Sequence, residues 1–465
     1  LGSRGLGDVY KRQGERIVAP TIPSEVITPN NPPTGWGILG DIYSRGWQRT
    51  DNTNNFLSFF ATFAYSFKNR YVVNANVRND ASNVFGQDIN HRIDPTYSFG
   101  LSWRASEEAF FQKHLKWITT LNFRGTFGIQ GNALTRESPE LILSQQGVQP
   151  GYNRYFSTIG QIPNPYLSWE RTRNWNFGVD LELFRMFYMN LEYYTRRSNA
   201  VITVDLPFEY GIDDMKRNGG IIYNRGIEYT LSFTPIQKRD FSLNINLNAS
   251  KNWNKGGETK IDRNTAMYLR GGSTQILKEG YPLSAFWSYS FAGLDGSNGK
   301  PMFNYVEVPD EEKSKSIDPT TYLVYSGETE PYFTGGLGFS FRYKSLSLNT
   351  SFSLLLGSKK RLPSPYSDFQ GSGSMMPDPT KNVNRDLLNR WQKPGDEVYT
   401  NIPGLPTWPI EIGWTLPNTD SAESAIEMWE KSDAMVVSGS FLRCRNIGLS
   451  WQMKKEWCDK ILSLI

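Results

Sequence analysis

Paired carboxylates are the first residues in this sequence that could perform chemistry. Asp213–Asp214, Glu311–Glu312 and Glu107–Glu108 each place two acids side by side. A glycosidase needs two carboxylates that the fold holds across one bond, and adjacency along the chain does not provide that arrangement. We therefore interpret these pairs as solvated loop or cap charges.

Nucleophile, metal and cofactor chemistry also lack a motif. A serine nucleophile would need a Gly-x-Ser-x-Gly-like elbow beside a histidine, and "GSGS" (371–374) is only a flexible loop. The two histidines lie far in sequence from Cys444 and Cys458, and no metal-ligand spacing joins them. We expect no enzyme, with no catalytic residue, no metal site and no cofactor.

The elements that must position any site are strands with two chemically different faces. In "FSLNINLNAS" (241–250), Phe, Leu, Ile and Ala alternate with Ser and Asn. Successive side chains of a strand point to opposite faces, so one face is apolar and the other carries Asn244, Asn246 and Asn248. With two weaker candidates, 121–129 and 285–293, we count about a dozen such strands. The stronger ones are 56–67, 71–80, 96–104, 173–184, 189–195, 226–234, 333–343, 345–356 and 445–453.

The connections alternate between short turns and long segments rich in Gly, Pro, Asn and Ser. Strands of ~10 residues joined in this way are typical of an outer-membrane barrel. In lipid every backbone polar group must be paired within the protein, so spanning strands close into a barrel. We predict an all-β fold, an antiparallel transmembrane β-barrel of the outer-membrane type. Its apolar face would meet acyl chains, and Asn244, Asn246 and Asn248 would face the lumen.

Composition agrees with a shell one layer thick. Hydrophobic residues make up only 38% of the 465 residues, whereas aromatics reach 14%. The net charge of +4 is close to balanced and gives no case for nucleic acid. Tyr and Trp near strand ends suit the aromatic girdles of a membrane barrel, with packing under a loop as the alternative. The candidates are Tyr71, Trp103, Trp175, Tyr193, Tyr194, Tyr229 and Trp451.

We divide the chain into three parts. Residues 1–13, "LGSRGLGDVYKRQ", resemble a sequencing or assembly scar and are excluded from the fold, and residues 14–55 form a loop leading into the barrel. Residues 56–465 form a partial barrel with long extracellular loops. The main loops are 130–170, 197–220, 251–283 and 357–438.

Several segments resemble the SusC/RagA family of TonB-dependent outer-membrane receptors. They include "NPYLSWERTRNWNFGVDLELF" (164–184), "NGGIIYNRGIEYTLSFTPI" (218–236) and "YFTGGLGFSFRYKSLSLNTSFSLLLG" (332–357). "YSFGLSWRASEEAFF" (97–111) and "SGSFLRCRNIGLSW" (438–451) add to the resemblance. The matches follow the family order from about residue 55 to 455.

The resemblance implies TonB-dependent uptake of oligosaccharides or peptides across a Gram-negative outer membrane. The implied partners are a SusD-like lipoprotein lid, the TonB complex through an N-terminal part, outer-membrane lipid and the glycan or peptide ligand. Because the family's signal peptide, TonB box, plug and closing strands are not visible here, we expect an incomplete barrel. It would be part of a barrel of ~22 strands.

Loop aromatics are the candidates for ligand contact. Trp408 and Trp414 lie in "LPTWPIEIGWTLP" (405–417), with Tyr366 upstream in the same long loop. Flat rings held by prolines offer stacking faces that lose little entropy on binding. The alternative is that these rings only pack the loop.

A second hypothesis comes from a different class of protein. The chain would then be a soluble or surface-attached β-rich carbohydrate-binding protein without transport activity. Its apolar strand faces would oppose one another across sandwiches instead of facing lipid.

Overall fold

The computed structural model describes most of the chain. The described residues are 4–7, 16–18, 48–50, 56–82, 93–132, 141–149, 154–206, 208–212, 214–257, 269–271, 277–304, 319–366, 382–405 and 424–453. Trp408 and Trp414 lie outside them.

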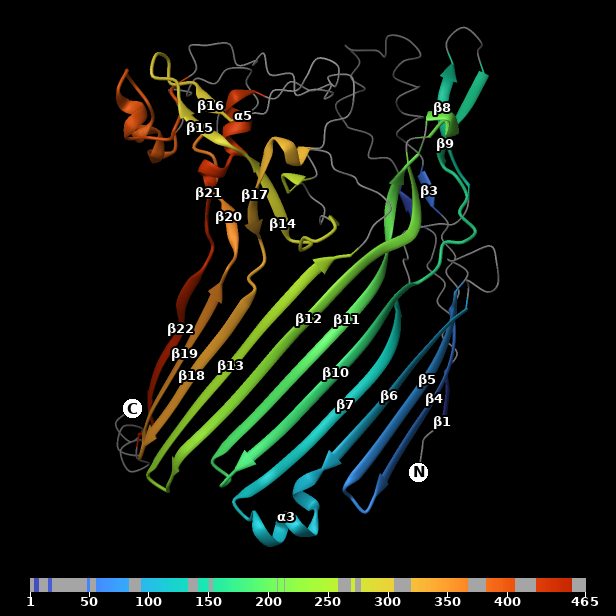
Figure 1. The fold of residues 1–465 in the computed structure, drawn as a ribbon, viewed down its shortest axis with the longest axis vertical. Helices are drawn as coiled ribbons and strands as arrows, with labels where there is room; N and C mark the ends of the chain where they lie inside the picture. The colour runs from blue at the N-terminus through green and yellow to red at the C-terminus, as the bar shows by residue number, and fades with distance from the viewer. Residues whose placement is uncertain are drawn as a thin grey trace, which may run out of the picture.

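One antiparallel sheet of 12 strands dominates the structure, in the order β1-β4-β5-β6-β7-β10-β11-β12-β13-β18-β19-β22. From β4 to β22 the strands stand in the sheet in the same order as along the chain, and β1 adds to the sheet by pairing with β4 (Figure 1). The strands are β1 (Arg4–Gly7), β4 (Phe56–Phe67), β5 (Tyr71–Ser82), β6 (Ile93–Arg104), β7 (Ile118–Asn132), β10 (Glu170–Leu183), β11 (Phe187–Asp205), β12 (Asp214–Gln237), β13 (Phe241–Gly256), β18 (Phe333–Tyr343), β19 (Leu346–Leu356) and β22 (Phe441–Trp451). The prediction of an all-β antiparallel fold is confirmed.

The strand register places apolar residues opposite apolar residues, and polar or small residues opposite one another. Leu247 pairs with Leu231 on β12 and with Leu337 on β18, whereas its neighbour Asn246 pairs with Ser232 and Gly338. Because side chains alternate between faces, matched registers make one face of the sheet continuously apolar and the other polar.

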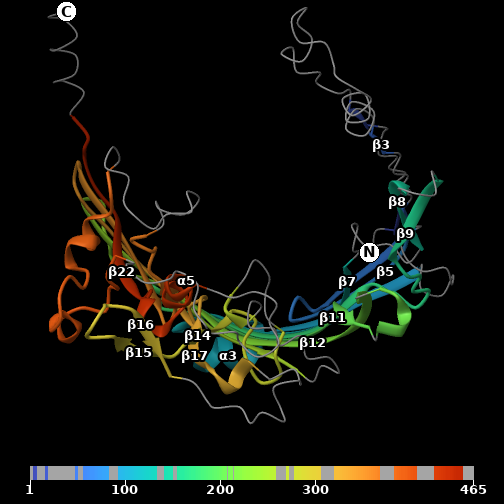
Figure 2. The same ribbon diagram turned by 90° about the horizontal axis from the view of Figure 1, so that it is seen from above.

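The sheet curves into an arc when seen from above (Figure 2). Side chains on a convex face splay apart, and those on a concave face converge. In β10, Arg173, Trp175 and Phe177 are exposed, while the intervening Asn174 and Asn176 are half-buried. The apolar face is therefore the convex, outward one, and the polar face is the concave, inward one.

Tight hairpins join the strands at one end of the sheet, which we call the short-turn end (Figure 1). Lys68 and Asn69 have φ of 50° and 57°, and Phe184 and Arg185 have φ of 53° and 58°. Two successive positive φ values are those of the type I′ turn, whose twist matches antiparallel strands. The link between β6 and β7 is longer and contains the 3₁₀ turn Ala105–Glu107 and helix α3 (Ala109–His114).

The opposite, long-loop end carries a layer of small elements with its own interior (Figure 1). Short antiparallel pairs build it: β14 (Ala285–Tyr289) with β17 (Leu323–Glu328), β15 (Phe291–Leu294) with β16 (Pro301–Phe303), and β20 (Lys359–Arg361) with β21 (Val436–Ser438). Two more pairs are β2 (Arg16–Val18) with β3 (Gln48–Thr50), and β8 (Ile142–Gln149) with β9 (Arg154–Gln161). Segment 285–293, a weaker barrel-strand candidate, thus lies outside the main sheet.

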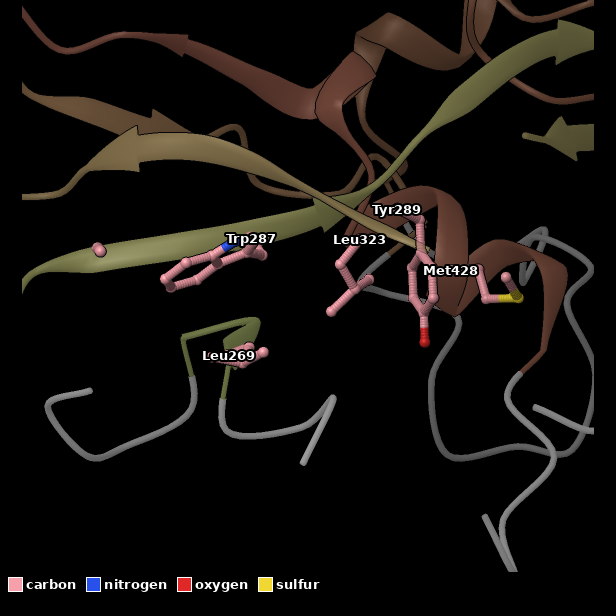
Figure 3. Packing of buried hydrophobic residues seen from close by; sticks show 6 residues of the cluster. Leu269, Trp287, Tyr289, Leu323 and Met428 are labelled. Atoms are coloured by element: carbon pink, nitrogen blue, oxygen red, sulfur yellow. The ribbon is translucent and has the colours of Figure 1, made fainter. Parts of the chain in front are cut away.

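Helix α5 (Ala425–Glu430) joins two buried clusters in this layer. A capping box starts it: Ser424 Oγ accepts from the Glu427 amide, and the Glu427 carboxylate accepts from the Ser424 amide. Met428 packs into the first core, with Leu269, Ala285, Trp287, Tyr289 and Leu323 (Figure 3). Ile426 and Trp429 pack into the second, with Tyr366, Leu387, Ala425 and Met435. Among the described residues, no helix is long and apolar enough to cross a membrane.

Several boundaries differ from the sequence-based expectation, and two of them have a clear physical reason. Segment 197–220 was expected to be loop, but β11 runs to Asp205 and β12 starts at Asp214. The β-branched run Val201–Val204 favours strand, and the hairpin continues beyond the alternating segment through a bulge at Ala200/Val201. Residues 4–7 of the excluded leader pair as β1 with β4, because an open sheet edge bonds any extended backbone.

Candidate ligand-binding surface

The outward face holds a broad band of exposed apolar side chains. Phe63, Phe99 and Phe177 are 53%, 46% and 51% exposed, and equivalent rows cross the sheet from β4 to β22. From Phe241 to Lys251, at ~3.3 Å per residue and a tilt of ~40°, β13 rises roughly 25 Å, the height of the apolar band of an outer-membrane barrel. A sandwich would bury such a band, so the soluble alternative does not fit these exposed rows.

Most of the candidate girdle aromatics lie on this outward face. Tyr71 and Trp103 pair at the short-turn end, and Trp175 and Tyr193 lie toward the long-loop end. Tyr229 and Trp451 share the outward rows. Tyr194 is the exception, because it follows Tyr193 and points inward, where its hydroxyl donates to Asn252 Oδ1 at 3.3 Å. It therefore belongs to the polar face and not to a girdle.

A hollow of about 920 Å³ lies on the inward face over β12, β13, β18 and β19. Its polar lining includes Asn246, Asn248 and Ser250 of β13, together with Thr334, Ser351 and Ser353. Glu228 and Arg445 are its charged members. A surface of amides and hydroxyls with one charge of each sign suits a polar, largely uncharged ligand.

Gly336 keeps this hollow open where β13 pairs with β18. A Cβ atom added at Gly336 would collide with Oδ1 of Asn248, so the Asn248 amide lies directly over the Gly336 backbone. Within the described residues Asn248 makes no hydrogen bond through its side chain, which leaves its amide available to a solute. Asn244, by contrast, donates to Thr234 Oγ1 at 2.7 Å and to Ser232 Oγ at 3.3 Å, and it does not line the hollow.

Arg445 reaches the hollow through a β-bulge. The register of β19 with β22 passes from Ser351↔Asn446 to Phe352↔Cys444, leaving Arg445 without a partner on β19. A bulge re-aims the extra side chain. Here the Arg445 guanidinium turns inward and donates through Nε to Ser353 Oγ at 3.1 Å.

A second polar cluster lies on the inward face of β7, β10 and β11. Arg124 contacts Glu192 Oε1 at 2.8 Å and Asp180 Oδ1 at 3.3 Å. It crosses β10 over Gly178, where a Cβ would come within 3.1 Å of the guanidinium. Asn190 donates to Asp180 at 2.8 Å, and Asn176 donates to Glu192 at 3.2 Å. The cluster carries a net negative charge, because two carboxylates surround one arginine.

The structure places Tyr366 inside the long-loop layer, 0% exposed. Its ring packs edge-on against Trp429 at 6.0 Å, and its hydroxyl donates to the Pro403 carbonyl. Burial raises the pKa of the Tyr366 hydroxyl, which therefore stays a protonated donor. In this arrangement Tyr366 supports the layer from beneath and has no exposed face on which a ligand could stack.

Two arginines brace the first core of the same layer. Arg361 donates to the backbone carbonyls of Arg270 and Trp287, and Arg270 donates to the Tyr289 hydroxyl at 2.7 Å. Burial, and then the neighbouring Arg270 cation, lowers the pKa of Arg361 to about 10. Arg361 thus holds backbone segments together and Arg270 holds a buried side chain, so both cations are structural in this geometry.

Sequence reasoning singled out the asparagines but not the charged residues beside them. Asp180 stood on the polar side of an alternating strand, which was a usable signal, but its pairing with Arg124 depends on a register between strands far apart in sequence. Arg445 carried no signal, because a bulge changes the face without changing the residue pattern. Among the described residues, no group of three or more His, Cys, Asp or Glu is placed to hold a metal ion.

Comparison with known proteins agrees with this geometry. TonB-dependent receptor P3 of Formosa agariphila is 24% identical over 437 residues, covering 88% of this chain and 40% of that protein. TonB-dependent receptor SusC of Bacteroides thetaiotaomicron is 25% identical over 428 residues, covering 87% of this chain and 38% of that protein. The chain thus spans about two fifths of the length of these curated relatives.

A solved structure shows the same fold. The structure described as that of the RagAB peptide transporter superposes with a TM-score of 0.67 at 22% identity, covering 93% of this chain and 44% of that chain. The profile of the family described as "TonB dependent receptor-like, beta-barrel" matches residues 7–353. The chain, with its outward apolar band and inward polar face, therefore belongs to the TonB-dependent receptor β-barrel family of the outer membrane.

Proposed function

We propose that this chain forms part of the barrel of a receptor that takes up oligosaccharides or peptides across the outer membrane. The inward face would line the lumen, so that Asn244, Asn246 and Asn248 face it, and Asn246 and Asn248, which line the hollow, would contact the ligand. The long loops would face the outside of the cell. The observation that carries the proposal is the inward hollow, whose amides, hydroxyls and single ion of each sign match the hydrogen-bonding groups of sugars and peptides.

The partners follow from the family. Uptake would be energised through the TonB complex, which acts on a plug, and a SusD-like lipoprotein would cover the long-loop end. The relatives named SusC and RagAB support this arrangement. The net negative cluster of Arg124, Asp180 and Glu192 offers a polar surface on which a plug could rest.

Trp408 and Trp414 remain proposed ligand contacts. They follow Leu405, at the end of a described segment whose second core contains Tyr366 and Leu387. That core gives the described segment a fixed base, and tryptophans with prolines near them in the sequence would lose little entropy on binding. Replacing both by Ala should weaken uptake without loss of assembly, and unchanged uptake would refute their role.

Asn248, which lines the hollow, gives the sharpest test of the proposed function. We expect Asn248→Leu in the intact receptor to reduce uptake of the cognate oligosaccharide or peptide about 5-fold, the effect of losing one hydrogen bond of ~1 kcal/mol. The matched control is Asn244→Leu, on the same strand and face but outside the hollow, which should change uptake less than about twofold.

The measurement is uptake of labelled oligosaccharides and peptides by cells that depend on the receptor. Barrel assembly is checked separately by heat-modifiable migration on a gel. Equal losses for the two variants, at equal assembly, would contradict the hollow as the site. A receptor that takes up no member of either ligand class would contradict the proposed function itself.

A further inference from the structure

A cluster of cations lies on the outward face, immediately on the long-loop side of the apolar band. Four neighbouring strands, β10 to β13, contribute to it, and all of its side chains are exposed. Between the short turns and the bulge at Ala200, the outward positions of these strands hold no Asp or Glu. We call it the outer basic cluster, made of Arg173, Arg197, Arg225 and Lys251, with Arg171 and Lys255 at its margins.

The tilt of the strands brings these cations to a common height. In Figure 1 the strands rise toward the right and β13 lies to the left of β10, so a register partner on β13 sits higher than its partner on β10. Arg173 lies two outward positions beyond the row of Phe177, Arg225 lies one beyond it, and Lys251 lies within it. The height gained from β10 to β13 is offset because the cations on β13 lie fewer positions along the strand than those on β10. The cations therefore form a line across the molecule.

Aromatic rings mark this line as an interface. Trp175 neighbours Arg173 on the outward face of β10, and Trp253 pairs with Arg225. Lys251 Nζ lies 5.0 Å from the Trp253 ring centroid, and the Arg197 guanidinium lies 5.9 Å from that of Tyr223. Tryptophan and tyrosine rings at the edge of an apolar band settle at headgroup level.

Within the part of the chain that the structure describes, no carboxylate neutralises Arg173, Arg197, Arg225 or Lys251. Among the described residues, none of these four cluster members forms an ion pair with a carboxylate, whereas two arginines of the inward face do. Arg124 pairs with Glu192, and Arg78 pairs with Asp80 at 2.7 Å. Arginines at headgroup depth without a carboxylate partner in the described part of the chain are available to an anion, and the planar guanidinium binds phosphate through two parallel hydrogen bonds.

We propose that the outer basic cluster binds the phosphate groups of anionic glycolipid in the outer leaflet. The inference rests on the proposed orientation, in which the long loops face outward. The lipid's acyl chains would lie on the apolar rows below, and its phosphates would meet the line of cations. The bound lipid would form a fixed collar on strands β10 to β13, on the opposite side of the sheet wall from the hollow.

The test uses the purified intact receptor and two probes: lipid A carrying two phosphates, and the same lipid after enzymatic dephosphorylation. Native mass spectrometry gives the affinity for each. A cation at an anionic membrane surface contributes ~1 kcal/mol, about a factor of five in affinity. We therefore expect R173Q/R197Q/R225Q to lower affinity for the phosphorylated lipid roughly 100-fold and to leave the dephosphorylated lipid unaffected.

The control removes the same number of charges at the short-turn end, as K238Q/R239Q/K344Q, and should bind both probes as the wild type does. Equal affinity of the wild-type receptor for the two probes would overturn the proposal, even if the triple variant fails to assemble. Unchanged affinity of the triple variant would overturn it as well. Protease shaving of intact cells reports the orientation separately: long loops inaccessible from outside would refute the proposed orientation, a different failure from loss of phosphate selectivity.

Discussion

At the scale of single residues, the hydroxyl of Tyr366 gives a direct test of the long-loop layer. Tyr366→Phe removes the donor to the Pro403 carbonyl and leaves that buried acceptor unsatisfied, at a cost of about 1–3 kcal/mol. We expect faster hydrogen exchange and faster proteolysis in residues 361–366 and 382–405, with the barrel unaffected. Tyr399→Phe is the control, since Tyr399 is 89% exposed. Equal protection in the two variants would contradict a structural role for Tyr366.

The residue scale also shows how far sequence reasoning reached. The alternation in 241–250 predicted that Asn244, Asn246 and Asn248 share a face, and period-two alternation suffices for that. It did not separate Asn248, which lies over Gly336 and has no side-chain hydrogen bond to another described residue, from Asn244, which donates a hydrogen bond to Thr234. That distinction depends on residues of neighbouring strands. Tyr366 looked like a loop residue because its burial depends on α5, far along the chain.

At the scale of elements, β13 offers adjacent positions with opposite expected behaviour. Leu247 lies in the middle of the outward band, and Asn246 lies on the inward face. An arginine on the lipid-facing side near the bilayer midplane costs about 2–4 kcal/mol, whereas lumenal substitutions are tolerated. We expect Leu247→Arg to reduce the heat-modifiable, membrane-inserted fraction strongly and Asn246→Arg to leave it near wild type. Similar assembly of the two variants would contradict the assignment of the faces.

Strands could be predicted from the sequence where each face of the strand meets a single environment, lipid or lumen, along its whole length. Segments 173–184 and 333–343, for example, became β10 and β18 with almost the same bounds. Prediction failed where the hairpin extends beyond the apolar band, as in 197–220, because a strand with no membrane beside it loses its two-faced pattern. It also failed at 285–293, where Phe286 and Trp287 are buried in a core of the loop layer and do not face outward.

At the scale of the whole molecule, the family resemblance predicted the architecture better than periodicity could. Alternation indicates a barrel but leaves its strand number open. The sheet described here has β1, paired on β4, at one end of its order and β22 at the other. In Figure 2 these two sides of the arc stand apart. A shallow arc of this kind suits a sector of a wide barrel, in line with the ~22 strands that the resemblance implies.

The open arc leads to a prediction about this chain expressed by itself. The unpaired N–H and C=O groups along β22 cannot enter lipid without a neighbouring strand, and its outward residues Leu442, Ile447 and Leu449 are 68–71% exposed. We expect the isolated chain to aggregate and to give no heat-modifiable monomer, whereas the same residues within a receptor of the relatives' length assemble normally. Gel migration with and without heating, in detergent and after reconstitution, decides between the outcomes. A stable monomer from the isolated chain would mean that β22 and the β1–β4 side of the sheet pair with each other, which would contradict the interpretation of the arc as a sector of a wider barrel.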